Sequence, residues 1–195
     1  MSEVIKPTLH HYGQMTPNID AMVEWYGKVV GYAVVARTTQ PIASAYVTND
    51  LVHHRGGFFT APNLATDLPR PRKGFGHIAF EYDSVDDLLE SWRRLKEEEG
   101  IEPLVTTFHP TTHWAFYYKD PDENVVELLA DGHGDREKSL AAIKHYETQD
   151  PMGPRVDPAL MLEARKQGAS LDDLRERTMR REFQPESYLG PEVLM

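Results

Sequence analysis

The chain has 195 residues, of which 40% are hydrophobic, and a formal net charge of −10 at pH 7. This composition predicts a folded core, and the negative charge argues against nucleic acid or an anionic membrane as a partner. The absence of cysteine excludes disulfides and thiolate metal sites. Because there is neither an apolar run long enough for a membrane span nor a recognisable secretion signal, we expect a cytoplasmic protein.

The first half of the chain predicts a β-α-β-β-β module over about residues 7–60. A strand over residues 7–16 is followed by a helix from Asn18 to Lys28, whose apolar residues recur on one face. Asn18 is a favourable N-cap residue for this helix, and Gly31 breaks the chain after it. Three further strands are expected near residues 32–36, 43–47 and 51–60.

The second half of the chain repeats this pattern. A shift of 66 positions (77 − 11) aligns His11 with His77, and the N-cap residue Asn18 with Ser84. The proline-containing residues 61–73 are the expected linker between the two copies. The second copy, about residues 74–131, has an expected strand at 75–82, a helix at 85–98, and strands near 102–107, 113–119 and 124–130. The sequence therefore predicts an internal duplication with a histidine on the first strand of each copy.

Charged helices are expected after the second module, in residues 133–195. They are predicted at 135–148, from Asp157 to Gly168, and from Ser170 to about Arg181. Their apolar stripes are too narrow to form a core alone, so we expect them to pack on the main domain or on a partner subunit. The final stretch, FQPESYLGPEVLM, has no regular pattern and is expected to be extended.

Two histidines and one glutamate form a candidate metal site. His11 and His77 lie on equivalent predicted strands, and Glu127 lies on the last predicted strand of the second module. Strand alternation gives each of them small or apolar neighbours, among which an isolated carboxylate is costly to bury. Two imidazoles and one carboxylate suit a divalent metal with open coordination positions, as in non-haem Fe(II) oxygen chemistry. Taken singly, each residue could be a structural histidine or a solvated glutamate; the symmetry of the repeat favours a shared site.

Five segments of the sequence carry a family resemblance: LHHYGQMT, WYGKVVGY, VHHRGGFF, GHIAFEYDSVDDL and AFYYKDPDENVVELL. They resemble the vicinal oxygen chelate (glyoxalase/bleomycin resistance/dioxygenase) superfamily and, within it, the type I extradiol catechol dioxygenases in a one-domain form. The similarity spans about residues 8–130. It implies an α+β fold in which two βαβββ modules form an open, mixed, barrel-like sheet around a metal site. On this basis residues 1–132 are the expected domain, and residues 133–195 are an extension.

The resemblance also implies the residues of the site. His11, His77 and Glu127 match the ligands of Fe(II), with Mn(II) as the alternative metal; His10 fits less well, because the family histidine directly precedes a hydrophobic-Gly pair. His54 matches a catalytic histidine on the fourth strand of the first module, and Tyr117 matches a tyrosine ten positions before the glutamate. The family places another histidine nine positions before that tyrosine, where this chain has Phe108. The further candidates are His109 or His113 for this last role, and His53 and His113 for substrate binding.

The implied function is an Fe(II)-dependent extradiol dioxygenase that cleaves the ring of a catechol-type aromatic and inserts both atoms of O2. Its expected partners are a small aromatic diol and O2, and a homo-oligomer, dimeric or higher, is expected. His54 would act as acid or base, and Tyr117 would hydrogen-bond a substrate oxygen. Candidates for holding a substrate carboxylate are Arg37, Arg55, Arg70 and Arg72.

Two other functions of the same fold stay open. A glyoxalase-like metal-dependent isomerase or epimerase usually takes a fourth protein ligand from the fourth strand, where His53 or His54 would serve. A non-enzymatic protein that sequesters drugs needs no metal. In that case the stacking residues would be Trp25, Trp114, Tyr118 and Phe58, each of which can equally belong to the core. His53 and His54 can also be exposed residues of an edge strand, and Tyr117 a core aromatic.

Overall fold

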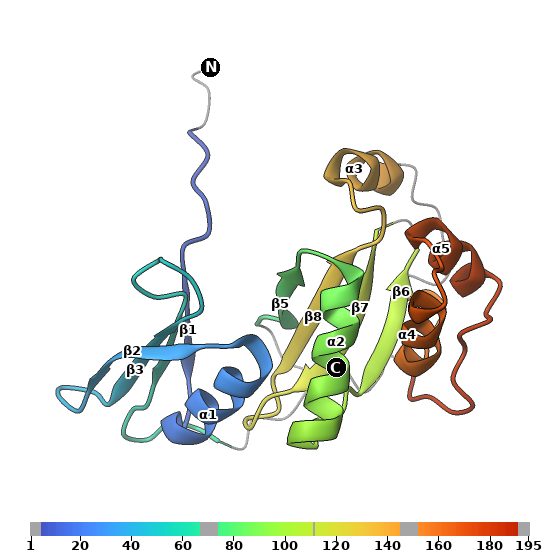
Figure 1. The fold of residues 1–195 in the computed structure, drawn as a ribbon. Coiled ribbons are helices and arrows are strands. Elements are labelled where there is room, and N and C mark those ends of the chain that lie inside the picture. The colour runs from blue at the N-terminus through green and yellow to red at the C-terminus, as the bar shows by residue number, and fades with distance from the viewer. Residues whose placement is uncertain (1–4, 67–73, 111, 145–151, 191–195) are drawn as a thin grey trace. The chain divides into compact units, whose positions relative to one another are not determined.

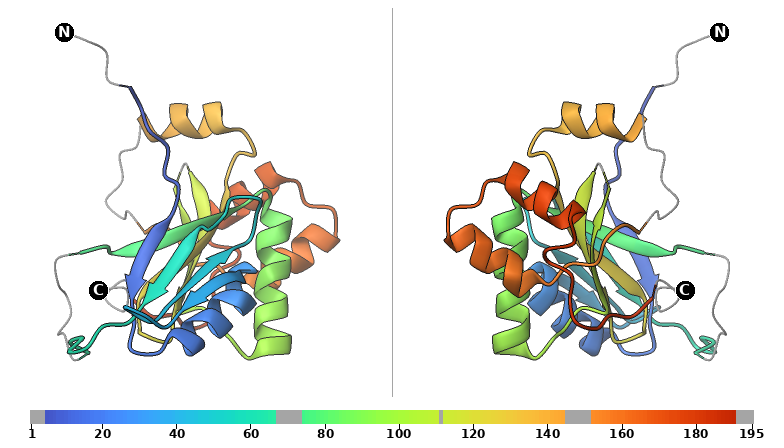
Figure 2. Two further views of the ribbon diagram at one scale, coloured as in Figure 1. Left: turned by 90° about the vertical axis from the view of Figure 1, so that its left-hand side faces the viewer. Right: turned by 90° about the vertical axis from the view of Figure 1, so that its right-hand side faces the viewer.

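The computed structural model describes residues 5–66, 74–110, 112–144 and 152–190. The chain divides into two compact units, Met1–Leu68 and Pro69–Met195. Each unit contains a four-stranded mixed sheet, with a helix between the first and second strands of the module (Figures 1 and 2). The predicted α+β class and the two βαβββ modules are therefore confirmed, and helices follow the second module as expected.

The first unit consists of β1 (Tyr12–Met15), α1 (Ile19–Val30), β2 (Ala33–Thr38), β3 (Ser44–Thr48) and β4 (Gly56–Phe59). Its strand order is β1-β4-β3-β2, with β1 parallel to β4. The Asn18 side chain accepts a hydrogen bond from the first turn of α1, and Gly31 ends the helix with a φ of 73°. The buried face of α1 consists of Met22, Tyr26 and Val29.

Two strands of the first unit are shorter than predicted, and the predicted site histidines lie outside them. β1 starts at Tyr12, so His11 lies one residue before the strand. β4 starts at Gly56 rather than at residue 51, so His53 and His54 lie in the loop that precedes it. The expectation that His11 and His54 are strand residues is therefore wrong.

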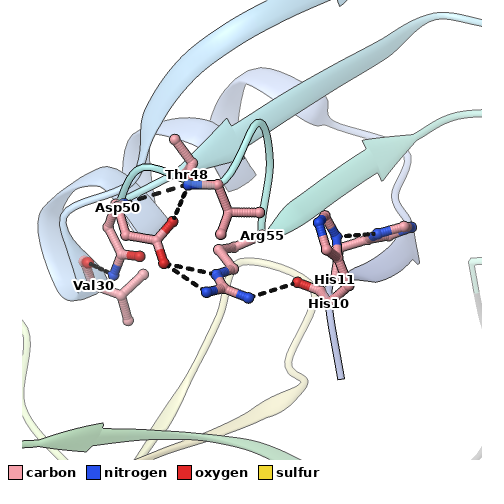
Figure 3. A network of polar contacts seen from close by, with 8 residues as sticks. His10, His11, Val30, Thr48, Asp50 and Arg55 are labelled. Carbon is pink, nitrogen blue, oxygen red and sulfur yellow. Dashed lines mark hydrogen bonds and ion pairs between the residues drawn. The ribbon is translucent and has the colours of Figure 1, made fainter. Parts of the chain in front are cut away.

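The carboxylate of Asp50 explains why β4 starts late. It accepts hydrogen bonds from the Val52 backbone N–H (2.9 Å) and from Arg55 Nε (2.9 Å), as well as from Thr48 Oγ1 at 3.0 Å. Figure 3 shows Asp50 between Thr48 and Arg55. These bonds close residues 50–55 into a turn-rich loop, because an aspartate side chain can satisfy nearby donors that would otherwise bond to a neighbouring strand.

The second unit contains β5 (His77–Tyr82), α2 (Val85–Glu99), β6 (Val105–His109), β7 (His113–Lys119) and β8 (Val125–Asp131). Its strand order is β5-β8-β7-β6, with β5 parallel to β8, which repeats the topology of the first unit. Ser84 caps α2, and Gly100 ends it with a φ of 66°. The buried face of α2 consists of Val85, Leu88, Leu89, Trp92 and Leu95.

The helices after the second module are α3 (Arg136–Lys144), α4 (Pro158–Lys166) and α5 (Leu171–Met179). α4 packs on α2, and Figure 2 shows these two helices side by side. The guanidinium of Arg165 on α4 contacts both carboxylate oxygens of Asp86 on α2, at 2.7 and 2.6 Å. The extension thus packs on the second module, which is one of the two predicted arrangements.

Residues 154–156, which precede α4, cover the outer edge of β6. The Phe108 backbone N–H donates to Pro154 O, and the Val156 N–H donates to Thr106 O, both at 3.1 Å. Thr107 and Arg155 form an antiparallel bridge between these two bonds. The edge of the second sheet is therefore paired by the extension rather than left open.

Parts of three predictions lie outside the described residues: residues 67–73 of the linker, 145–148 of the helix at 135–148, and 191–195 of the terminal stretch. The division into a domain over residues 1–132 and an extension over residues 133–195 stays a prediction. Among the helices in the described ranges, none has the length and hydrophobicity that a membrane span requires.

Candidate metal centre

Glu127 on β8 is the centre of a polar cluster in the second unit. Its carboxylate is almost completely buried, with 3% of the residue exposed. His77 Nε2 lies 3.0 Å from Oε2, whereas His113 Nε2 lies 3.1 Å from Oε1 and the Tyr117 hydroxyl donates to Oε1 at 3.2 Å. The cost of burying this carboxylate is therefore offset by donors on both of its oxygens.

The pairing of the sheet explains why these side chains meet. Glu127 pairs directly with Tyr117 on β7 and with Ala79 on β5, two residues after His77. Because side chains two residues apart on a strand share a face, His77 and Glu127 lie on the same face of the sheet. His113 belongs to this face for the same reason, four residues before Tyr117 on β7.

Hydrogen bonds set the charge of the Glu127–His77 pair. Burial acts to raise the pKa of Glu127, but the hydrogen bonds from His113 and His77 outweigh it and lower the pKa to about 2. The hydrogen bond to Glu127 raises the pKa of His77 above its usual value, against the opposite effect of burial. Without a metal, the site therefore favours an ionised carboxylate beside a protonated imidazole, and a divalent cation would replace that proton.

His109 and Tyr117 extend the cluster toward β6. His109 Nε2 lies 2.7 Å from the Tyr117 hydroxyl oxygen. Burial and the nearby charge of Glu127 raise the pKa of Tyr117 well above its usual value, so the phenol stays neutral. His109 and His113 are the two candidates for the family histidine that position 108 does not supply. The structure brings both into the cluster: His109 contacts Tyr117, and His113 contacts Glu127.

The one-residue displacement of His109 from the family spacing has a structural reason. Phe108 occupies the family position, but its side chain is buried and its ring packs against Trp114, with centroids 4.7 Å apart. Alternation then places the next residue, His109, on the opposite face of β6, opposite His113 in the strand pairing. The histidine that reaches the cluster is therefore the one after the aromatic residue.

The side chains of this cluster fit a divalent metal by their chemistry. The ligand atoms of His109, His113 and Glu127 lie within 4.8 Å of one another. His113 Nδ1 lies 2.9 Å from Thr112 Oγ1, which orients the other ring nitrogen toward Glu127, as is common for metal-ligating histidines. Imidazole nitrogens and a carboxylate oxygen are the donors that first-row transition metals accept. Glu127 thus has imidazole neighbours in two places. His77 lies at one carboxylate oxygen, and His113, with His109 nearby, lies at the other.

The predicted site histidines of the first unit also lie together. The rings of His11 and His54 are 4.3 Å apart between centroids, and those of His53 and His54 are 4.4 Å apart. His10 Nδ1 lies 3.0 Å from His11 Nδ1, and Arg55 donates to the backbone oxygen of His10 (Figure 3). The cluster therefore holds the His10–His11 segment beside the loop that precedes β4.

The environment of His54 favours its neutral form. Burial lowers its pKa, and the neighbouring imidazoles of His11 and His53 lower it further. His54 Nδ1 faces His53 Nδ1 at 2.5 Å, so its Nε2 atom is the one directed away from this contact. A neutral imidazole is able to accept a proton near neutral pH.

The predicted residues thus fall into two groups. His11, His53 and His54 cluster within the first unit, and His77, His109, His113, Tyr117 and Glu127 cluster within the second. Arg155, which no pattern in the sequence indicated, also lies near the second group. No periodic pattern surrounds it in the stretch Gly153-Pro154-Arg155-Val156, and only its pairing with β6 brings it to the sheet.

Comparisons with known proteins give both a family and close relatives. The model of the Glyoxalase/Bleomycin resistance protein/Dioxygenase superfamily matches residues 8–128. The chain is 34% identical over 172 residues to biphenyl-2,3-diol 1,2-dioxygenase 3 of Rhodococcus globerulus, which covers 87% of this chain and 88% of that protein. It is 32% identical over 167 residues to biphenyl-2,3-diol 1,2-dioxygenase 2 of the same organism, with 85% of each covered.

Solved structures share the fold. A glyoxylase/bleomycin resistance protein/dioxygenase domain from Frankia sp. EAN1pec has a TM-score of 0.55 at 17% identity, covering 65% of this chain and 99% of that chain.

The sequence similarity extends beyond the two modules. The match to the first Rhodococcus relative covers 87% of the chain, so it cannot end at residue 132. The similarity therefore includes part of the extension, although the recognisable motifs end near residue 130.

Proposed function

The chain belongs to the Glyoxalase/Bleomycin resistance protein/Dioxygenase superfamily, and we propose that it is an extradiol dioxygenase that cleaves a catechol-type ring with O2. The observation that carries this proposal is the buried, ionised Glu127 with imidazoles at both of its oxygens. Such a donor set suits a redox-active divalent metal. The relatives from Rhodococcus globerulus, which are named as dioxygenases of a biphenyl diol, support the same reaction class.

We assign His11, His77 and Glu127 as the residues that would hold Fe(II), with Mn(II) as the alternative. His77 contacts the Glu127 oxygen that His113 and Tyr117 leave open, and it is the repeat equivalent of His11. When bound, such a metal supplies electron transfer between the diol and O2, which removes the need for a separate cofactor.

The surrounding residues would bind the diol and move its protons. His54, whose pKa is lowered, would take a proton from a diol hydroxyl at Nε2. Tyr117 would turn its one phenol hydrogen from Glu127 to a substrate oxygen, and His109, as the tautomer that carries its proton on Nε2, would donate to the phenol oxygen and fix its orientation. His113 would keep Glu127 Oε1 hydrogen-bonded and so orient the carboxylate. His53 lies beside His54 and would contact the substrate there.

Oxygen uptake tests this function directly. Protein reconstituted with Fe(II) without air is mixed with a panel of catechols, and O2 consumption is followed together with the yellow colour expected of a ring-opened product. We expect uptake with at least one catechol and none with the Glu127→Ala variant. No uptake with any catechol would contradict the proposal. Turnover that needs no O2, with bound Ni or Zn, would indicate an isomerase instead.

A further inference from the structure

Arg155 is a buried cation that has no acidic partner in the described part of the chain. The residue is 9% exposed, and its Nη1 atom donates to Thr107 Oγ1 at 3.4 Å and to Gly153 O at 3.2 Å. Its Nε atom is buried and has no hydrogen-bond partner among the described residues. A buried guanidinium with an unused N–H group is unfavourable unless an anion completes it.

The side chain of Arg155 lies on the face of the sheet that carries the candidate metal centre. Arg155 pairs with Thr107 on β6, and Thr107 precedes His109 by two residues, so both share that face. Thr107 also pairs with Ala115 on β7, two residues before Tyr117, so the phenol that we assign to substrate binding belongs to the same face.

The extension holds Arg155 in place without using its charge. Gly153 has a φ of 65°, and a Cβ atom there would lie 2.1 Å from Phe108 O, so only glycine permits this close approach to β6. Val156 N donates to Thr106 O, and Thr106 Oγ1 donates back to Val156 O at 2.6 Å. These bonds to β6 already fix the segment, so the guanidinium is not needed to attach it.

One aromatic ring of the extension lies near the guanidinium of Arg155. The ring of Tyr188 lies 5.8 Å from its central carbon, within the range of a cation–π contact. Met152, three residues before Arg155, packs on the apolar cluster of Val105, Ala115, Tyr117 and Val125. Arg155 is thus preorganised at the border of the candidate site, and a ligand would not have to order it.

We propose that Arg155 binds a carboxylate on the substrate, so that the preferred substrates are catechols that carry a carboxylate substituent. This inference rests on the proposed function. The Nε–H that has no partner among the described residues, together with a terminal N–H, can hold a carboxylate through two hydrogen bonds. The arginines expected from the sequence are less suitable: Arg37 pairs with Asp20 and Arg55 pairs with Asp50, while Arg70 and Arg72 lie outside the described residues.

The first test compares acids with their methyl esters on the unmodified protein. Catechols with a carboxylate attached to the ring directly, or through one or two methylene groups, are each paired with the ester. We expect kcat/KM for at least one acid to exceed that for its ester by about 10- to 100-fold, the range for a hydrogen bond to a charged group. If the protein turns over the esters and kcat/KM is the same for the acid and the ester of every pair, the inference is wrong, although the proposed function stands.

The second test uses variants. Arg155→Met should remove the preference for the acid, so that kcat/KM becomes about equal for the acid and its ester, and Arg155→Lys should keep part of the preference. The matched control is Arg180→Met, which replaces an exposed arginine at the C-cap of α5. This variant should keep the full preference for the acid. An undiminished acid preference in Arg155→Met would overturn the inference.

The third test needs neither metal nor turnover. Calorimetric titration of the metal-free protein with 3-phenylpropanoate and with its amide measures the carboxylate contact alone. We expect the acid to bind at least about 10-fold more tightly than the amide, and this difference to vanish in Arg155→Met. Equal binding of the two probes to the unmodified protein would contradict the role of Arg155. If this difference is found but no catechol consumes O2, the proposed function fails while the anion site stands.

Discussion

Glu127 determines the chemistry of the second unit at the scale of single residues. It is a buried carboxylate that stays ionised because His113 and His77 hydrogen-bond it, and Tyr117 adds a third donor. The hydrogen bond between Glu127 and His77 in turn raises the pKa of His77. The raised pKa of His77 favours a proton on its imidazole in the metal-free site, so metal binding there is expected to release protons.

The Glu127–His77 pair should make the stability of the metal-free protein depend on pH. The contribution of His77 is fully present below its ordinary pKa of 6.5 and is lost as the pH rises through the raised value. The contribution of Glu127 is present above its ordinary pKa of 4.5 and is lost as the pH falls through about 2. This pair therefore contributes most between these two ordinary values.

Urea unfolding of the metal-free protein at a series of pH values measures this dependence. Glu127→Gln removes the charge, so the loss of stability on the alkaline side should disappear, and NMR titration should show a lower pKa for His77 in this variant. An unchanged His77 pKa in Glu127→Gln would contradict the pairing.

Metal binding by single-histidine variants separates the two sets of imidazoles around Glu127. His77→Ala should abolish tight binding of Fe(II), because it removes a ligand. His113→Ala should weaken binding by about 10- to 100-fold, as expected for a residue that only orients a ligand. Anaerobic titration with Fe(II) measures both. The reverse order would show that His113, with His109, holds the metal and that His77 does not.

At the scale of elements, short strands and loops decide where the site residues lie. The repeat and the apolar stripes predicted the helices well: the predicted starts of α1 and α2 match. Both helices run slightly further than predicted, α1 to Val30 instead of Lys28 and α2 to Glu99 instead of residue 98, and Gly31 ends α1 as expected. The length of the loop before β4 was not predicted, because the side chain of Asp50 competes with the strand for donors. A pattern of alternating residues does not reveal such a competition.

The close approach of the extension to β6 is also a feature that only the structure reveals. Gly153→Ala should destabilise the protein by about 2–4 kcal/mol, because the new Cβ would collide with Phe108 O and the residue has a positive φ. Gly168→Ala is the matched control: it also has a positive φ, but a Cβ there meets nothing within 4 Å. Its cost should be about 1 kcal/mol, from backbone strain alone. Equal effects of the two variants on the urea midpoint would contradict the packing of residues 152–156 on β6.

At the scale of the whole molecule, a duplicated module explains most of what the sequence could predict. Strand-helix-strand periodicity is a local signal, so the two modules and the pair His11 and His77 could be recognised from the residues alone. The contacts of Arg155 could not, because they depend on pairing between segments about 48 residues apart (155 − 107). The similarity to the Rhodococcus relatives extends into the extension, which agrees with a role for it beyond the two modules.

The fate of molecular oxygen is the sharpest test of the proposed dioxygenase activity. The Fe(II)-loaded protein is given a catechol that it turns over under oxygen-18 gas, and the ring-opened product is analysed by mass spectrometry. An extradiol dioxygenase places both labelled atoms in that product. A control in labelled water measures how much label the product loses by exchange. A product that carries one labelled atom or none, after correction for this exchange, would contradict the proposed dioxygenase reaction.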